Sequence, residues 1–302
     1  MDDTSLSYWL GLREQADWTA RPPVLAQTIA AVLPRDQPVC VLDLGTGAGS
    51  NLRYLVERLP EQQHWLVIDR SPALLSEVNT RTKSWAAERG HAVGSDAKGF
   101  TLSSERLDCR VEVSAQDLGT LHDPSIFAGR HLVTASALLD LVSETWLQTL
   151  ASRCRSAGAA ALFTITYDGR SSCLPAEPED ELVRGLMNTH QRRDKGLGGP
   201  AAGPDATACA ERCFVAEGYR VTSEATDWVL GPGDAEVQRP LIEGWAEAAL
   251  EEAPQLAETI ASWRARRLAH VDAGESHLVV GHRDLAAWPD AGRGEAVGHS
   301  LR

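Results

Sequence analysis

The sequence predicts an α/β fold: one doubly wound, mostly parallel seven-stranded sheet with helices on both faces. Three observations lead to this prediction. Short apolar runs typical of buried strands alternate with longer segments of helical periodicity. The first of these runs leads into a glycine-rich turn, Gly45 to Gly49, that opens a helix. Acidic residues then close the following strands, as expected where a ligand lies at the carboxyl ends of a parallel sheet.

The chain begins with a helical cover over residues 1–37. Apolar residues recur at helical spacing from Ser5 to Leu33, with a break at Pro22-Pro23. The alternating part then predicts strands at 39–44, 65–69, 110–113, 132–136 and 159–166, helices at 50–59, 72–89 and around 146–150, and a loop or hairpin at 90–105.

The regular alternation ends after the fifth strand. Segments 168–206 and 235–270 are expected to be lid or substrate insertions, because each adds helical sequence between strands. The remaining predicted elements are helices at 179–188, 206–217 and 235–269, and strands at 219–230 and 276–282. We therefore expect one domain over residues 1–285 and a disordered tail over 286–302.

Composition restricts the class of partner. The 302-residue chain carries a formal net charge of −13 and no basic stripe, which disfavours nucleic acid as a substrate. No run of ~20 apolar residues suited to a membrane span occurs, and no apolar signal region follows the acidic amino terminus. The six cysteines lack metal-ligand spacing. We expect a cytoplasmic monomer or homodimer that acts on a small molecule without a metal.

The spacing of the glycine loop separates two kinds of cofactor. A dinucleotide fingerprint is G-x-G-x-x-G. Here the third glycine, Gly49, comes one residue early, and Ser50 occupies the place of the last glycine. Asp43 precedes the loop and would repel a pyrophosphate. The pattern D-x-G-x-G-x-G resembles motif I of the class I S-adenosylmethionine (SAM) methyltransferases, and a similarity to that family extends over about residues 38–166.

This resemblance implies a set of cofactor-binding residues. Asp69 would accept hydrogen bonds from the ribose hydroxyls, a device that NAD proteins share. Asp117 would accept one from the adenine amino group, with the Leu118 N–H serving a ring nitrogen. Arg13 and Arg21 are expected to clamp the cofactor carboxylate in two-point geometry. The full set of cofactor-binding candidates is Asp43, Gly45, Thr46, Gly47, Gly49, Asp69, Arg70, Asp117, Leu118, Ser136 and Arg21.

The segment Ser136–Asp140 resembles motif IV of the family in position and apolar character, where the methionine part of the cofactor meets the acceptor. It lacks the N-P-P-Y form. That difference argues against a DNA-adenine or protein-glutamine methylase. Asp140 is a candidate to orient the acceptor, although a surface aspartate at the start of a helix fits the position equally well.

The implied reaction is an in-line transfer of a methyl group from SAM to a small-molecule acceptor, releasing S-adenosylhomocysteine. Alignment and exclusion of water supply most of the catalysis, and a hydroxyl acceptor also benefits from a general base. The catalytic candidates are His190, Asp140 and Asp194, with Asp194 orienting His190. The substrate-binding candidates are Tyr167, Arg192 and Lys195.

Two other functions fit parts of the pattern. A NAD(P)-dependent oxidoreductase would also place a carboxylate at Asp69, but the glycine spacing and Asp43 disfavour it. A non-catalytic, methyltransferase-like module that binds SAM would keep the same loop. Cofactor binding tests the first alternative, and a methyl-transfer assay tests the second.

Overall fold

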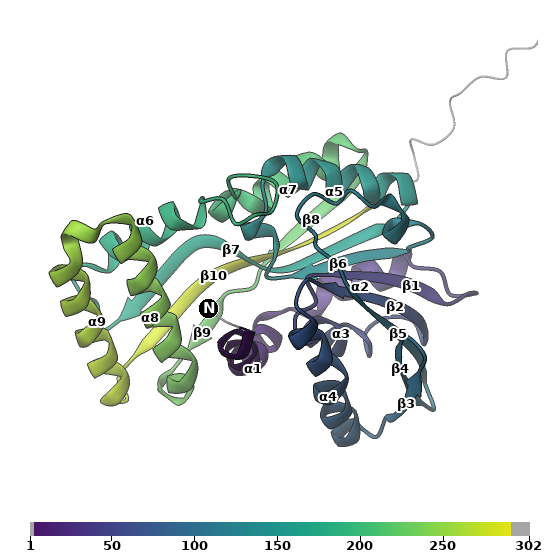
Figure 1. Ribbon diagram of the computed structural model, residues 1–302, viewed down its shortest axis with the longest axis horizontal. Coiled ribbons are helices and arrows are strands. Elements are labelled where there is room, and N and C mark those ends of the chain that lie inside the picture. The colour runs from purple at the N-terminus through teal and green to yellow at the C-terminus, as the bar shows by residue number, and fades with distance from the viewer. Residues whose placement is uncertain (1–2, 291–302) are drawn as a thin grey trace, which may run out of the picture.

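A ten-stranded mixed sheet forms the centre of the computed structural model, which describes residues 3–290 (Figure 1). Its strands are β1 (Val39–Leu44), β2 (Gln62–Asp69), β3 (Ala92–Asp96), β4 (Gly99–Ser104), β5 (Leu107–Ala115), β6 (Leu132–Ser136), β7 (Ala160–Leu174), β8 (Tyr219–Ala225), β9 (Trp228–Leu230) and β10 (His277–Pro289). The order is β3-β4-β5-β2-β1-β6-β7-β10-β8, with β9 paired to β10. Strands β5, β2, β1, β6 and β7 are parallel, and β10 is antiparallel to β7. The predicted doubly wound α/β sheet is therefore confirmed, and β3, β4 and β9 extend it.

Helices cover both faces of this sheet. They are α1 (Asp3–Ala20), α2 (Pro23–Val32), α3 (Ser50–Leu55), α4 (Pro72–Arg89), α5 (Glu144–Ala157), α6 (Asp180–Gln191), α7 (Ala206–Ala216), α8 (Ala235–Glu252) and α9 (Ala257–Asp272). Apolar residues of α5 and α7 form one core with β6 and β7, and those of α2, α3 and α4 form another with β1, β2 and β5. Because both faces are buried, the central strands are apolar on both sides.

Local sequence signals explain where the helices begin and end. The Ser71 hydroxyl accepts a hydrogen bond from the Leu74 N–H at the start of α4, and Pro72 occupies its first turn. Gly90 ends the same helix in the left-handed conformation, at φ 75°. Helix α5 has the same signals, with a serine cap before it and a glycine after it.

Several predicted boundaries are wrong in informative ways. Strand β7 continues to Leu174, so residues 168–174 are strand and not insertion. Strand β10 continues to Pro289 and pairs with β8, so the predicted tail does not begin at 286. Residues 291–302 of that tail lie outside the described residues. The predicted strand 219–230 divides into β8 and β9, and Pro254 divides the predicted helix 235–269 into α8 and α9.

Two features of the arrangement define the site. Helices α6, α8 and α9 gather at the far end of the long β7–β10 pair, while α1 lies between α3 and β9 (Figure 1). Ion pairing and a hydrogen bond hold α1 on both sides: Arg53 of α3 contacts Glu14 at 2.7 Å, and the Trp228 Nε1–H of β9 donates to Asp17 at 3.1 Å.

Between residues 3 and 290, no helix is both long and apolar enough to cross a bilayer.

Candidate cofactor and acceptor site

The glycine loop after β1 is a tight turn that requires left-handed backbone. Gly45, Gly47 and Gly49 have φ values of 65°, 54° and 85°, a region that side chains with a Cβ rarely adopt. The Gly49 N–H donates to the Thr46 carbonyl, and the Thr46 N–H donates to the Ile68 carbonyl of β2, each at 2.9 Å. The loop is thus anchored to the neighbouring strand, and its glycines leave its backbone open to a ligand.

Asp43 braces the loop from beneath and does not line the cavity. Its carboxylate accepts hydrogen bonds from the Thr46 Oγ1–H at 2.7 Å and the Asn51 Nδ2–H at 2.8 Å. Asn51 also donates to Thr134 Oγ1 of β6 at 3.0 Å. Burial raises the pKa of Asp43 to about 6, against these hydrogen bonds, which lower it. The Asp43 carboxylate therefore stabilises the conformation of the glycine loop.

Arg21 is directed into the same buried network, which corrects the prediction that it clamps the cofactor. Its Nη1 donates to Asn51 Oδ1 at 3.1 Å, and its Nε lies 3.7 Å from Asp284 Oδ2 on β10. The guanidinium also lies 3.7 Å from the centre of the Tyr54 ring. Sequence reasoning did not identify Asn51 or Asp284. A polar residue two positions after the last loop glycine was the only signal for Asn51.

Asn51→Ala is expected to lower the free energy of unfolding by about 2–3 kcal/mol, because it leaves buried Arg21 and Asp43 groups without partners. Urea unfolding measures this. Asn79→Ala is the matched control, since the Asn79 Oδ1 has no hydrogen-bond partner within the described chain, and it should change stability by less than about 0.5 kcal/mol. Equal losses in the two variants would contradict the role given to Asn51.

Asp69 lies at the end of β2, as predicted, beside the loop. Its Oδ2 accepts a hydrogen bond from the Gly47 N–H and its Oδ1 accepts one from the Ser71 N–H, both at 2.9 Å. Each carboxylate oxygen retains a second lone pair for a ribose hydroxyl. Asp69 is half-buried and the neighbouring Arg70 is exposed, and neither side chain lines the cavity at the loop.

A cavity of about 50 Å³ lies between the glycine loop and α1. Its walls comprise Leu10, Arg13, Glu14, Asp17, Gly45, Thr46, Gly47, Ala48, Ser50, Asn51, Arg53, Ser136 and Ala137. Leu10 reaches the loop, with its Cδ1 3.1 Å from the place that a Cβ on Gly47 would take. This volume is well below the ~300 Å³ at which ligand pockets begin, because α1 lies close over the loop.

Arg13, the other arginine predicted to clamp the cofactor carboxylate, lines this cavity, whereas Arg21 does not. Its Nε and Nη2 donate to the two oxygens of Asp17 at 3.0 and 3.1 Å, on the same helix. Burial raises the pKa of Asp17, with Arg13 acting against it. A guanidinium here suits a carboxylate of a bound ligand.

A second, more open cavity of about 520 Å³ lies past the end of β5. Asp117 and Gly119 line one side, and Asp194 and the glycines of residues 196–199 line the other. The Asp117 Oδ1 accepts a hydrogen bond from the Gly119 N–H at 2.8 Å, while Leu118 is buried and its carbonyl accepts from the Trp146 indole at 2.7 Å. Asp117, the residue predicted to bind the adenine amino group, therefore faces the glycine-rich segment after α6 across this cavity.

Asp140 is the carboxylate without a full set of partners. It lies just past β6, is 7% exposed, and its Oδ1 has no hydrogen-bond partner among the described residues. Burial raises the pKa of Asp140 to about 6, while backbone N–H groups and the charges of Arg13 and Lys195 lower it. Asp140 is therefore a buried residue and not a surface residue, three positions along the chain from Ala137 of the cavity wall.

His190 and Asp194 do not form the predicted pair. The His190 Nε2 lies 3.1 Å from Glu251 of α8, and its Nδ1 lies 3.5 Å from the Lys195 Nζ. Asp194 instead accepts a hydrogen bond from the Gly196 N–H at 2.7 Å and so shapes the glycine segment. The carboxylate that orients His190 is Glu251, which only the packing of α6 on α8 brings near.

The predicted substrate residues have different surroundings. Arg192 is exposed and pairs with Asp205 at 2.6 Å. The Lys195 Nζ donates to the His190 carbonyl, and burial lowers its pKa. Tyr167 is buried and its hydroxyl donates to Asn188 Oδ1 of α6 at 2.8 Å.

His282 of β10 is a buried residue that sequence reasoning missed. Its ring lies 6.2 Å from that of Tyr167 and 4.9 Å from that of Trp228, centre to centre. Burial lowers the pKa of His282 to about 3, so it is neutral. Only the pairing of β10 with β7 places it beside Tyr167.

Within residues 3–290, no three His, Cys, Asp or Glu side chains gather in a way that could hold a metal ion.

Comparison with known proteins gives one family match: residues 41–128 match the family described as "Methyltransferase domain". No curated protein sequence matches the chain.

Solved structures resemble the chain at low similarity. A putative methyltransferase of Bacillus halodurans C-125 is 12% identical with a TM-score of 0.46, covering 88% of this chain and 96% of that chain. A SAM-dependent methyltransferase of Geobacter sulfurreducens, in complex with S-adenosylhomocysteine, is 15% identical with a TM-score of 0.42, covering 90% and 92%. The cyclopropane synthase MmaA2 of Mycobacterium tuberculosis is 13% identical with a TM-score of 0.43, covering 87% and 82%. All three TM-scores are low, and the family match and the loop geometry are the stronger grounds for a function.

Proposed function

Because residues 41–128 match the family described as "Methyltransferase domain", we propose that this chain is a class I SAM-dependent methyltransferase that moves a methyl group from SAM to a small-molecule acceptor. The observation that carries the proposal is the glycine loop at the end of β1, with Asp69 and Asp117 at the ends of the next two parallel strands. Parallel α/β sheets bind ligands at this edge.

The residues at this edge fit the proposed cofactor. The half-buried Asp69 and the exposed Asp117 suit the ribose hydroxyls and the adenine amino group, and Arg13 suits the carboxylate of the methionine part. The bound cofactor would supply a methyl group already activated on a sulfonium. The chain's own contribution is to hold the acceptor in line and to exclude water. Helix α1, which covers the loop, suits the second task.

Asp140 is our candidate for the general base. A buried carboxylate oxygen without a partner can accept a proton from a bound hydroxyl, and its raised pKa brings it closer to neutral pH. His190 is the weaker candidate because both of its ring nitrogens already lie near partners, Glu251 and Lys195. We therefore favour an acceptor that loses a proton to Asp140 as its oxygen or nitrogen takes the methyl group.

A small acceptor fits the site better than a macromolecule. The cavity at the loop lies under α1. The chain as a whole is acidic, with a formal net charge of −13. Such a surface repels nucleic acid phosphates.

Calorimetry with SAM and S-adenosylhomocysteine tests the cofactor directly, with NAD and NADP as controls. We expect binding in the micromolar range, ~8 kcal/mol, for the two adenosyl-sulfur ligands and none for the nicotinamide nucleotides. Preference for NAD or NADP would instead support an oxidoreductase. Transfer of labelled methyl from SAM to a panel of phenols, alcohols and amines then separates an enzyme from a module that only binds SAM.

A further inference from the structure

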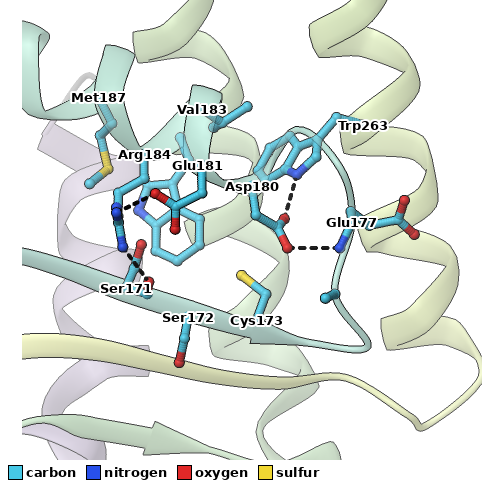
Figure 2. Close-up of a pocket in the computed structure, with 12 residues that line it drawn as sticks. Ser171, Ser172, Cys173, Glu177, Asp180, Glu181, Val183, Arg184, Met187 and Trp263 are labelled. Atoms are coloured by element: carbon cyan, nitrogen blue, oxygen red, sulfur yellow. Dashed lines mark hydrogen bonds and ion pairs between the residues drawn. The ribbon is translucent and has the colours of Figure 1, made fainter.

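We propose that a second cavity, between α6, α8, α9 and the far end of β7, binds a small uncharged aromatic molecule at a site separate from methyl transfer. Its volume is about 280 Å³. Figure 2 shows Ser171 and Cys173 of β7 on one side of it and Val183 and Met187 of α6 on another. Pockets for drug-sized ligands begin near ~300 Å³, so this one suits a molecule of one or two rings.

The cavity is far from the reacting end of the sheet. Ser136, at the loop cavity, pairs with Thr164 of β7, whereas Ser171 lies seven residues further along the same strand. At 3.3 Å per residue, seven strand residues span up to about 23 Å. A single ring bound in this cavity does not reach a methyl group near Ala137. The ligand of this cavity is therefore not the ring that carries the acceptor atom.

A buried network holds the walls in place. Asp180 Oδ1 accepts hydrogen bonds from the Trp263 indole at 2.8 Å and from the Arg267 Nε at 2.9 Å. Arg267 is fully buried and also donates to the Pro175 carbonyl at 2.6 Å. These contacts tie α9 to the start of α6, so the cavity is formed before any ligand binds, which lowers the cost of binding.

The charges around the cavity pair with one another. Glu181 pairs with Arg184, Glu177 pairs with Arg266 and His270, and Asp180 pairs with Arg267. A charged ligand would therefore lose its hydration without gaining an unpaired partner.

The remaining surface favours a flat apolar molecule. Trp245, Trp263, Val183, Met187 and Cys173 are buried and apolar or soft, and sulfur and indole groups contact aromatic rings favourably. No hydrogen bond engages the Ser171 hydroxyl in the described chain, so one ring N–H or O–H of the ligand finds a partner at the strand.

Calorimetry of the full chain with indole, tryptamine and indole-3-acetate tests the proposal, since the three molecules share the indole ring system and differ in charge. We expect indole to bind with a dissociation constant below ~1 mM, and the two charged analogues to bind at least ~10-fold more weakly. Saturating S-adenosylhomocysteine should leave the indole affinity unchanged. Displacement of indole by that ligand would place it in the cofactor site and overturn the proposal.

Two variants fill the cavity from different walls: Ser171→Trp on β7 and Met187→Trp on α6. Each should lower the indole affinity at least ~10-fold, because the new ring takes the space of the ligand. Ser223→Trp, at a similarly half-buried serine on β8, is the matched control and should bind indole like the wild type. Unchanged affinity in both cavity variants, or no indole binding by the wild type, would refute the site. Neither result depends on methyl transfer.

Discussion

Replacing Gly47 with valine is expected to lower the affinity for SAM by at least ~100-fold, about 2.7 kcal/mol. Gly47 lies in the wall of the loop cavity, and a Cβ built on it meets only the Leu10 Cδ1, at 3.1 Å. The valine side chain would therefore occupy the space between the loop and α1, where we propose that the cofactor lies. Calorimetry with SAM and S-adenosylhomocysteine measures the loss.

The control must separate occupied space from backbone strain. Gly47 has a φ of 54°, so any side chain there is strained whether or not a ligand binds. Gly129 has a φ of 66° and no atom within 4 Å of its Cβ position. Gly129→Val should therefore lose a comparable ~1–3 kcal/mol of stability and keep wild-type affinity for SAM. If the two variants lost affinity equally, the place given to the cofactor would be wrong.

Replacing Asp140 with asparagine is expected to slow methyl transfer by ~10²-fold or more while increasing stability at neutral pH. The wild-type rate should rise with pH through about 6, the pKa to which burial raises this carboxyl, and the variant should lack that rise. Binding of S-adenosylhomocysteine should not change. A wild-type rate in Asp140→Asn would return the base role to His190.

The stability change has a defined pH dependence. Because the folded pKa of Asp140, about 6, lies above the ordinary value of 3.8, the folded state binds more protons than the unfolded state between these values. Its contribution to stability is therefore fully present below pH 4 and is lost as pH rises through 6. The variant should gain about 2–3 kcal/mol over the wild type at pH 8 and little at pH 4.

Asp284→Asn provides the comparison. Burial raises the pKa of Asp284 to about 6 as well, yet this carboxylate is satisfied: it accepts hydrogen bonds from the Ile165 N–H at 2.7 Å and the Thr226 hydroxyl at 2.8 Å, and it pairs with Arg21. Its replacement leaves a buried guanidinium without its partner and should cost about 3 kcal/mol at pH 8. Opposite signs in the two variants distinguish a functional carboxylate from a structural one.

Local sequence determined most of the fold. Strands β1 and β6 and helix α4 have the predicted bounds, because each combines an apolar pattern of the right period with glycine, proline or serine signals at its ends. The loop of Gly45, Gly47 and Gly49 was equally predictable from the sequence, since a left-handed turn restricts the residue type at each position. The lengths of β7 and β10 were not, because each strand continues only where the other pairs with it.

The residues of the site divide in the same way. Some can be predicted from their position in the sequence, and others depend on the residues that pack against them. The sequence by itself placed Asp69 and Asp117 at strand ends, since an apolar run and the carboxylate that follows it are close together in the chain. Only the tertiary structure paired Arg21 with Asp284, separated it from Arg13 at the cavity, paired His190 with Glu251 and left the Asp140 Oδ1 without a partner among the described residues. Such pairings join residues far apart in the chain, and burial decides their charge, so no pattern along the sequence contains them.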